Sequence, residues 1–389
     1  MKSLIVSRLL TIFPAMLLPP HPTCAAIDRS AFLHNLACVR SYCGREVRIM
    51  AVVKANAYGH GAVELSRAAA SAGVEALAVA RVGEALELRQ SGIDLPLLTF
   101  ELAPEEHLAV ALAEGIELTV GTAVGGEAVS RAALRADRTA RIHVKVDTGM
   151  GRLGFAVSRA AAEIDTLLRL PRLELAGVYS HFATSESPDK SFAQTQLESF
   201  LRVIDELRRR TINVPLRHMA NSGAIMTMPE AHLDLVRPGI MLYGYAPAPE
   251  MTQRFAVRPV LSLLSSIIQL KTVESGTSIS YGRRYVTNRR AVIATVPLGY
   301  ADGFPRSLTG HASALINGKR YPVVGTICMD HLMLDLGERT DCRVGDLVTL
   351  IGSDGTEHIT AWDLATAMGT IPYEITSMIS SRVPRIAAT

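Results

Sequence analysis

The side chains best suited to chemistry in this chain come directly after short apolar segments. Lys54 ends the segment RIMAVVK, where loss of hydration would favour the neutral amine that forms a Schiff base with a carbonyl group. A solvated lysine at the end of a strand is the alternative interpretation. Tyr58 and the glycines at positions 59 and 61 follow closely, and they favour a functional site at Lys54 over a solvated lysine.

Three polar residues, His143, Lys145 and Asp147, alternate with apolar residues in the segment IHVKVD. A strand points alternate side chains to opposite faces, so these polar groups would share one side of the sheet. A buried lysine needs a charged partner or must lose its proton, and a pairing of Lys145 with Asp147 without a chemical role is one alternative. Arg152 follows in the glycine-rich TGMGRLG, and its planar guanidinium suits a carboxylate.

Two loop motifs, NSG at 221–223 and RPGI at 237–240, could hold a phosphate. Each would present backbone N–H groups where a loop meets a helix, which binds an anion without adding much charge. Simple turns are the alternative interpretation. Arg237, at the start of the second motif, could bind an anion or contact a ring nitrogen.

The elements that must position these residues alternate between strands and helices from about residue 47 to 240, as in βα units around a parallel sheet. Helices are predicted in GAVELSRAAASAG, VGEALELRQSG, PEEHLAVALAEG and QTQLESFLRVIDELRRR. Strands are predicted to end near Val53, Ala80, Phe100, Val120, Val146, Ser180, Met219 and Val236. These units predict an α/β fold, a (β/α)8 TIM-type barrel, with an open doubly wound sheet as the alternative. A barrel would gather the polar groups, with His181, on one rim.

A second, mainly β domain is predicted after about residue 257, where strand-like segments are separated by turn signals. The pairs Asn317-Gly318 and Asp354-Gly355 are typical of hairpins. A short helix is predicted in TAWDLATAMG. We therefore expect an N-terminal extension over residues 1–25, a barrel over 26–256 and a C-terminal β domain over 257–389.

Composition and the N-terminus narrow the class of protein. The formal charge is +3 and the basic residues are scattered, so we expect no nucleic-acid partner. Five cysteines without a CxxC pair predict neither a disulfide framework nor a metal site. Lys2, Arg8, the apolar residues 9–18 and Cys24-Ala25-Ala26 resemble a weak signal peptide, interrupted by Pro14. The apolar run is too short to span a membrane. We expect a cytoplasmic protein without a membrane partner, with export to the periplasm as the alternative.

The motifs of this chain, taken together and in order, resemble those of the alanine racemase family. The resemblance runs from about Pro22 to Pro384 and rests on AVVKANAYGHG, HVKVDTGMGRLG, YSHFATSE, HMANSGA, LVRPGIMLYG, SISYGRRY, PLGYADG, GTICMDHLMLDL and IPYEITSMISSRVPR. It implies a fold-type-III barrel that binds pyridoxal 5'-phosphate, followed by a β domain. It also implies a head-to-tail homodimer with shared active sites.

The resemblance further implies roles for individual residues. Lys54 would bind the cofactor through a Schiff base and act as the base for D-alanine, while Tyr281 would be the base for L-alanine on the opposite face of Cα. Arg152 and the backbone of Met329 would hold the substrate carboxylate. Lys145 matches a position that can be carbamylated to give Arg152 a negative partner. Contacts to the cofactor would come from Tyr58, His181, Ser222, Arg237, Gly239, Ile240 and Tyr373.

The expected activity is therefore that of an isomerase that interconverts L- and D-alanine and supplies D-alanine for peptidoglycan. A broad-specificity amino-acid racemase of the same fold and a pyridoxal-phosphate-binding barrel without catalysis are the alternatives. Tyr373 and the sequence ICMD indicate a small pocket, and the second domain with its tyrosine base argues against a carrier. The substrate entrance would be shaped by Glu186, Tyr300 and Arg306.

Overall fold

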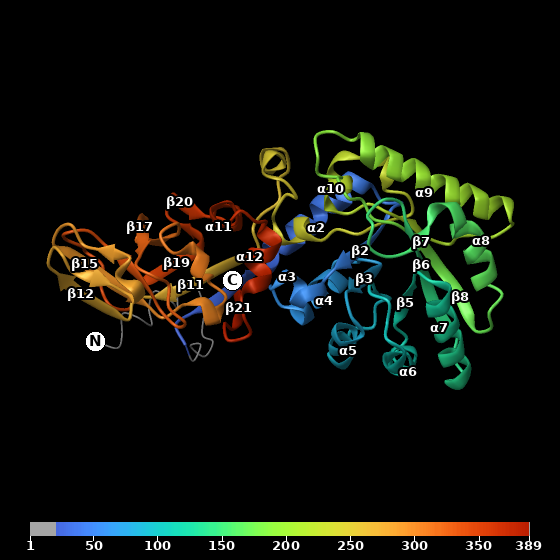
Figure 1. Cartoon of the computed structure of the whole chain (residues 1–389), viewed down its shortest axis with the longest axis horizontal. Coiled ribbons are helices and arrows are strands. Elements are labelled where there is room, and N and C mark those ends of the chain that lie inside the picture. The colour runs from blue at the N-terminus through green and yellow to red at the C-terminus, as the bar shows by residue number, and fades with distance from the viewer. Residues whose placement is uncertain (1–20, 389) are drawn as a thin grey trace. The chain divides into compact units, whose positions relative to one another are not determined.

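The computed structural model describes residues 21–388, which form two compact units. The barrel unit comprises residues 33–57 and 61–258, and the C-terminal unit comprises residues 21–32, 58–60 and 259–388. Figure 1 shows the elements of both units along the chain. Each unit is built around its own sheet.

The sheet of the barrel unit is closed and parallel, which confirms the predicted (β/α)8 barrel. Hydrogen bonding between β10 and β2 and between β5 and β6 completes the ring. Its side chains are almost all buried, as expected for strands covered on both faces. Within the described residues the strands of the ring are β2 (Arg48–Val52), β3 (Ala76–Val79), β4 (Leu97–Thr99), β5 (Glu117–Val120), β6 (Ala140–Asp147), β8 (Leu173–Tyr179), β9 (Arg217–His218) and β10 (Leu235–Val236).

Helices connect these strands and place their apolar faces against the barrel. Three of the predicted helices end before a glycine with positive φ, namely Gly73, Gly92 and Gly115, a conformation that glycine adopts without a steric cost. A short strand, β7 (Phe155–Ala156), pairs with β6 outside the ring. The longer helices are α2 (Arg29–Cys43), α4 (Ala62–Ser71), α5 (Val82–Gln90), α6 (Glu105–Ala113), α7 (Ala123–Arg135), α8 (Val157–Leu167) and α9 (Ser191–Arg209).

The C-terminal unit is mainly β, as predicted. Its main sheet has the order β12-β15-β18-β17-β16-β19-β11-β1-β21, with β20 paired to β19. Asn317 and Gly318 turn the β16–β17 hairpin with φ values of 51° and 73°, the left-handed pair that their sequence predicts. The strands are β11 (Leu261–Ser266), β12 (Gln269–Val273), β13 (Ser278–Ile279), β14 (Tyr285–Val286), β15 (Ala291–Val296), β16 (Ser313–Ile316), β17 (Lys319–Val324), β18 (Leu332–Asp335), β19 (Leu347–Asp354), β20 (Glu357–Ile359) and β21 (Arg385–Ala388).

Short helical turns complete both units. The predicted helix in TAWDLATAMG is α11 (Ala361–Met368), and it begins with a capping box between Thr360 and Asp363. It is followed by α12 (Pro372–Met378). The remaining turns are α3 (Lys54–Tyr58), α10 (Ser222–Thr227), η1 (Pro229–Ala231), η2 (Ile240–Tyr243), η3 (Pro249–Arg254), η4 (Tyr281–Arg283), η5 (Tyr300–Asp302) and η6 (Arg306–Leu308).

The first described strand, β1 (Cys24–Asp28), belongs to the C-terminal unit. It pairs antiparallel with β11 and parallel with β21, and Cys24, Ala25 and Ala26 are buried. The predicted extension over residues 1–25 is therefore wrong at its end, because Cys24 and Ala25 pair through their backbone with β11 and β21 and are buried. Cleavage after Ala26 would remove most of β1. The remainder of the signal-like segment, residues 1–20, lies outside the described residues, and no helix among residues 21–388 is long and apolar enough to cross a membrane.

Candidate active site

The carboxyl ends of the barrel strands bring together the polar residues that the sequence predicted. Lys54 follows β2, Lys145 lies near the carboxyl end of β6, and Arg237 follows β10. His181 follows β8, and its pKa lies well below its usual value because of its burial and the charges of Arg237, Lys145, Arg152 and Lys54. The rim is therefore a cluster of basic groups, in which the guanidinium groups of Arg237 and Arg152 keep their positive charge and favour anionic ligands.

Lys54 is half-buried at the start of α3. Burial lowers its pKa, and the charge of Arg152 lowers it further, against a smaller opposing effect of Glu84 and Glu101. A lowered pKa increases the share of neutral amine, the form that acts as a nucleophile or a base. Lys54 is therefore partly desolvated, unlike the solvated strand-end lysine of the alternative interpretation.

A left-handed turn of four non-glycine residues, Ala55–Tyr58, comes directly after Lys54. Its φ values lie between 52° and 55°, a conformation that costs roughly 1–2 kcal/mol per residue. The side chain of Asn56 accepts a hydrogen bond from the backbone of Ala62 at 2.8 Å, and Glu84 accepts one from Ala55 at 2.6 Å. These contacts hold a backbone that the sequence alone would not adopt, and strain of this kind is concentrated at functional sites.

The end of this turn belongs to the C-terminal unit, where Tyr58 lies beside Tyr373 with their ring centroids 5.8 Å apart. Burial raises the pKa of Tyr58, so it carries its proton and can donate it. Arg385 donates to the carbonyl of Gly59 at 2.9 Å and to carbonyls of residues 379–383. Gly59 is required at this point, because a Cβ there would lie 2.0 Å from the carbonyl oxygen of Thr376.

Arg237 is the most deeply buried charge of the rim, with 3 % of its surface exposed. Burial lowers its pKa to about 10, which still leaves it charged at neutral pH. It donates to the carbonyls of Ser180 at 2.7 Å and Met219 at 3.1 Å, and it lies over the ring of Tyr179 at 5.2 Å. Its Nη2 also lies 3.4 Å from Nδ1 of His181.

A chain of hydrogen bonds connects Arg237 to a carboxylate inside the barrel. Nη1 of Arg237 lies 2.8 Å from Nδ1 of His218, Nε2 of His218 lies 2.9 Å from Nδ1 of His143, and Nε2 of His143 lies 2.9 Å from Glu117. A guanidinium only donates and a carboxylate only accepts. Each imidazole can therefore satisfy both neighbours only as the neutral ring with its proton on Nε2. We call these four residues the buried relay.

Sequence reasoning missed the buried relay. The alternation in IHVKVD correctly indicates that His143 lies with Lys145 on one polar face of its strand. Glu117 begins the apolar strand ELTV, and His218 was only part of a motif. Their partnership depends on the neighbouring positions of β5, β6, β8 and β9 in the ring, which the sequence does not display.

Lys145 is buried, and the structure does not pair it with Asp147. Its Nζ donates to the carbonyl of Val146 at 3.1 Å and lies 5.2 Å from the centre of the Tyr179 ring. Burial, and then the charge of Arg237, lower its pKa to about 7, so a large share of this side chain is a neutral amine at neutral pH. Among the described residues Lys145 and Asp147 form no ion pair, and the charge of Asp147 raises the pKa of Lys145 by less than burial and Arg237 lower it.

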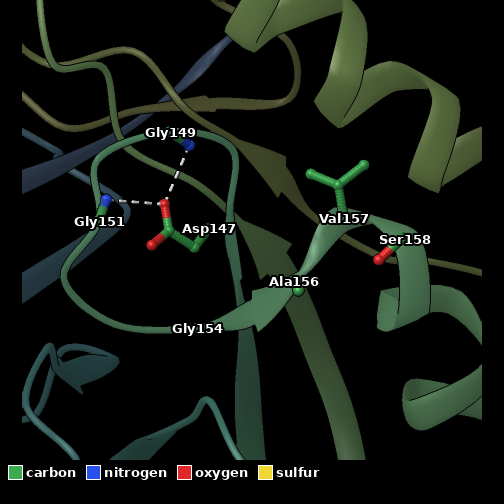
Figure 2. A pocket seen from close by; sticks show the side chains of 7 residues that line it. All are labelled: Asp147, Gly149, Gly151, Gly154, Ala156, Val157 and Ser158. Atoms are coloured by element: carbon green, nitrogen blue, oxygen red, sulfur yellow. Dashed lines mark hydrogen bonds between the residues drawn. The ribbon is translucent and has the colours of Figure 1, made fainter.

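Asp147 instead organises the glycine-rich loop that follows β6. Its carboxylate accepts hydrogen bonds from the backbone N–H groups of Gly149 at 3.0 Å and Gly151 at 3.1 Å (Figure 2). The backbone N–H of Arg152 donates to the same carboxylate at 3.2 Å. The loop thus fixes the position of Arg152, whose side chain is exposed. An open pocket beside the loop is lined by Asp147, Gly149, Gly151, Gly154, Ala156, Val157 and Ser158.

The two predicted phosphate motifs meet at Ser222. Its Oγ accepts hydrogen bonds from the backbone of Gly239 at 3.0 Å and of Met241 at 3.4 Å, so its own proton remains available for a further acceptor. Asn221 caps α10 and accepts a hydrogen bond from Ser185 at 2.7 Å. The loop carrying Gly239 and Ile240 therefore lies against Ser222, as a shared phosphate site would require.

The other predicted site residues lie on the C-terminal unit, at the surface. The exposed fractions are 71 % for Tyr281, 52 % for Met329 and 41 % for Tyr300. Tyr300 and Met329 are neighbours, because backbone N–H groups of η5 donate to the carbonyls of Cys328 and Met329. Arg306 begins η6 in the same unit, whereas Glu186 lies on the barrel unit.

Two further predictions concern cysteines and metals. In residues 21–388 all five cysteines have free thiols. The same part of the chain holds no group of three His, Cys, Asp or Glu side chains that could bind a metal ion.

The closed barrel with a cationic rim, followed by a β domain, defines a two-domain barrel enzyme. The model of the alanine racemase N-terminal domain matches residues 27–247, and that of the C-terminal domain matches residues 260–387. The chain is 41 % identical to alanine racemase of Clostridium tetani, over 94 % of this chain and 95 % of the relative. It is 42 % identical to that of Methanococcus maripaludis, over 94 % and 98 %.

A solved structure is also similar throughout. The alanine racemase of Bacillus anthracis with bound L-Ala-P superimposes with a TM-score of 0.91 at 36 % identity, covering 96 % of each chain. This chain therefore belongs to the alanine racemase family, and it is an isomerase.

The buried relay predicts a defined dependence of stability on pH. Burial raises the pKa of Glu117, but the hydrogen bond from His143 and the hydrogen bond and charge of Arg141 outweigh it and lower the pKa from 4.5 to about 2. The difference between the folded and unfolded pKa values means that the carboxylate stabilises the fold by about 3 kcal/mol above pH 4.5. This contribution to the free energy of unfolding is lost as the pH falls towards 2. Glu117→Gln should be less stable at pH 7 in urea unfolding, by a difference that shrinks below pH 4.5.

Glu174→Gln is the matched control for this experiment. Glu174 also pairs with Arg141, at 2.7 Å, but its side chain is half exposed and does not contact His143. We expect its substitution to change the free energy of unfolding by less than about 1 kcal/mol. Equal effects of the two substitutions, or a Glu117→Gln effect that stays constant with pH, would contradict the buried relay.

Proposed function

We propose that this chain interconverts L-alanine and D-alanine with pyridoxal 5'-phosphate, using Lys54 and Tyr281 as proton-transfer groups on opposite faces of the substrate Cα. The observation that carries the proposal is the rim itself, where Lys54, with a lowered pKa, and the buried Arg237 both act on His181. The relatives named alanine racemase favour this activity over a broad-specificity racemase. The match of the second domain to its own family model argues against a barrel without catalysis.

The residues of the rim fit pyridoxal phosphate. The amine of Lys54 suits its aldehyde, and Arg237 presents a donor-only group to its ring nitrogen. The hydroxyl of Ser222 and the N–H groups around Gly239 and Ile240 suit its phosphate, with Tyr58 and Tyr373 as additional hydroxyl donors. When bound, this cofactor delocalises the electron pair that remains at Cα after a proton is removed.

The chain's own residues decide where the proton goes. Lys54 as a neutral amine removes or returns the Cα proton on one face, and the phenol of Tyr281 does so on the other. Arg152 and the backbone N–H of Met329 bind the substrate carboxylate and hold Cα between the two groups. Because Arg237 stays protonated, with a pKa of about 10, it does not take part in the proton exchange, and it would donate to the cofactor's ring nitrogen without giving up its proton.

Lys145 supports the substrate anchor in this proposal. A buried amine with a pKa of about 7 is in large part neutral, and a neutral amine attacks the carbon of CO2 and loses a proton to give a carbamate. The charge of Arg152 is one of those that lower this pKa, so the two groups lie within electrostatic range. The carbamate would give Arg152 a negative partner and orient it towards the substrate.

The two bases can be separated by substitution. Lys54→Ala should lose the visible absorbance of the lysine-bound cofactor, whereas Tyr281→Phe should keep it. In D2O, Tyr281→Phe should no longer exchange the Cα proton of L-alanine but should still exchange that of D-alanine, because only one face has lost its base. Loss of exchange from both enantiomers to the same extent would show that the two-base assignment is wrong.

We propose in addition that the active site is shared between the two subunits of a homodimer, with the exposed Tyr281 and Met329 serving the partner's barrel. Lys54→Ala and Tyr281→Phe proteins should each be inactive. When equal amounts of the two variants are mixed and exchange subunits, half of the dimers become heterodimers. In each heterodimer one of the two active sites has both bases. About a quarter of wild-type activity should then return. No recovery, with subunit exchange verified by mass spectrometry, would place both bases on one chain.

A further inference from the structure

The backbone on both sides of Tyr281 is strained. Ser280 has φ 65° and ψ −175°, a region that is nearly exclusive to glycine. Gly282 and Arg283 follow with φ values of 70° and 47°. Three of the four residues 280–283 thus have positive φ. Ser280 occupies a position where a glycine would relieve the strain.

Two hydroxyl groups hold this turn on both sides of Tyr281. Oγ of Ser280 donates to the carbonyl of Thr326, and Oγ1 of Thr326 donates to the carbonyl of Tyr281 at 2.7 Å. The two segments approach closely at Gly325, where a Cβ would lie 2.7 Å from the carbonyl oxygen of Ile279. The exchange of hydrogen bonds is reciprocal, and it fixes the peptide groups before and after the tyrosine.

Packing does not fix the tyrosine in the same way. The side chain of Tyr281 is 71 % exposed, and within residues 21–388 its hydroxyl has no hydrogen-bond partner. The position of its oxygen therefore depends on the direction in which the backbone projects it. A proton-transfer group must be placed within a fraction of an ångström, and a displacement of 1 Å can cost about 100-fold in rate.

We propose that Ser280 and Thr326 are positioning residues that use the strained turn to aim Tyr281 at its substrate. The proposal rests on the role of Tyr281 given above. Glycine at position 280 would relieve the strain but lose the hydroxyl that ties the turn to residue 326. The strain is retained because the serine supplies one half of the hydrogen-bonded pair and Thr326 supplies the other.

The segment that holds the turn of Tyr281 also includes a second predicted site residue, Met329. The thiol of Cys328 lies 3.3 Å from Oγ of Ser280, and Gly299 approaches this segment so closely that a Cβ would lie 2.3 Å from the carbonyl oxygens of Cys328 and Met329. Residues 325–329 therefore connect the turn of Tyr281 with the backbone of Met329. A change at Thr326 acts on the base first, because its hydroxyl bonds directly to the carbonyl of Tyr281.

The test compares Thr326→Val, which removes the hydroxyl, with Thr326→Ser, which keeps it. Thr287→Val is the control, because Thr287 is also buried in this hairpin region and donates to the carbonyl of Glu274 at 2.7 Å. Initial rates of deuterium incorporation at Cα are measured for each enantiomer of alanine with the holoenzyme. Thr326→Val should lower exchange from L-alanine about tenfold or more and exchange from D-alanine less than about twofold. Thr326→Ser should restore it, and Thr287→Val should show no selectivity between the enantiomers.

Two measurements that do not involve activity accompany this test. Hydrogen–deuterium exchange of the backbone over residues 278–286 should be faster in Thr326→Val than in Thr287→Val, because the turn opens more readily. Ser280→Gly should have a higher Tm than Ser280→Ala, by about 2 °C or more, because only glycine relieves the strain at this φ and ψ. At an unstrained position alanine would give the higher Tm.

The outcomes separate this inference from the proposed function. Wild-type protein without alanine racemisation, or Tyr281→Phe without a selective loss, would overturn the proposed function. With both of those results as expected, an equal loss of exchange from both enantiomers in Thr326→Val would overturn the positioning role. So would unchanged exchange from L-alanine in Thr326→Val, or a failure of Thr326→Ser to restore it.

Discussion

The positive charge of Arg237 inside the barrel is the constraint on which the site depends. A buried guanidinium is stable only if its donors are satisfied and its charge is balanced. Carbonyl groups of Ser180 and Met219 accept two of its hydrogen bonds, and the buried relay connects a third donor through two neutral imidazoles to the carboxylate of Glu117. Three residues of the relay lie in β5, β6 and β9 and Arg237 follows β10, so the ring must close in one register for these hydrogen bonds to form.

This charge shapes the chemistry of its neighbours. It lowers the pKa of His181 and of Lys145, in each case after the larger effect of burial, and thereby favours neutral bases at the rim. Lys54 is affected in the same direction by its own burial and by Arg152. A rim whose amines can be neutral, and whose guanidinium groups cannot, suits a reaction in which an anionic ligand is bound tightly while protons move at its carbon.

The sequence predicted the barrel and the position of its polar rim, because strands and helices of regular length alternate and parallel strands bring their carboxyl ends together. It did not predict the buried relay, since Glu117 lies in an apolar strand and contacts His143 only because β5 pairs with β6 when the ring closes. The sequence did not predict the strand at Cys24, because the segment Cys24–Ala26 lacks the β-branched and aromatic residues that indicate a strand. The strained turn at Ser280 carries no local signal, and the role of Tyr281 followed from family resemblance.

The tautomers of His143 and His218 test the central claim most directly. They can be read from the nitrogen chemical shifts of the two imidazole rings in 15N-histidine-labelled holoenzyme at neutral pH. The account predicts that both rings are neutral and carry their proton on Nε2, so that every donor from Arg237 to Glu117 meets an acceptor. A doubly protonated ring at either position, or a proton on Nδ1, would contradict it.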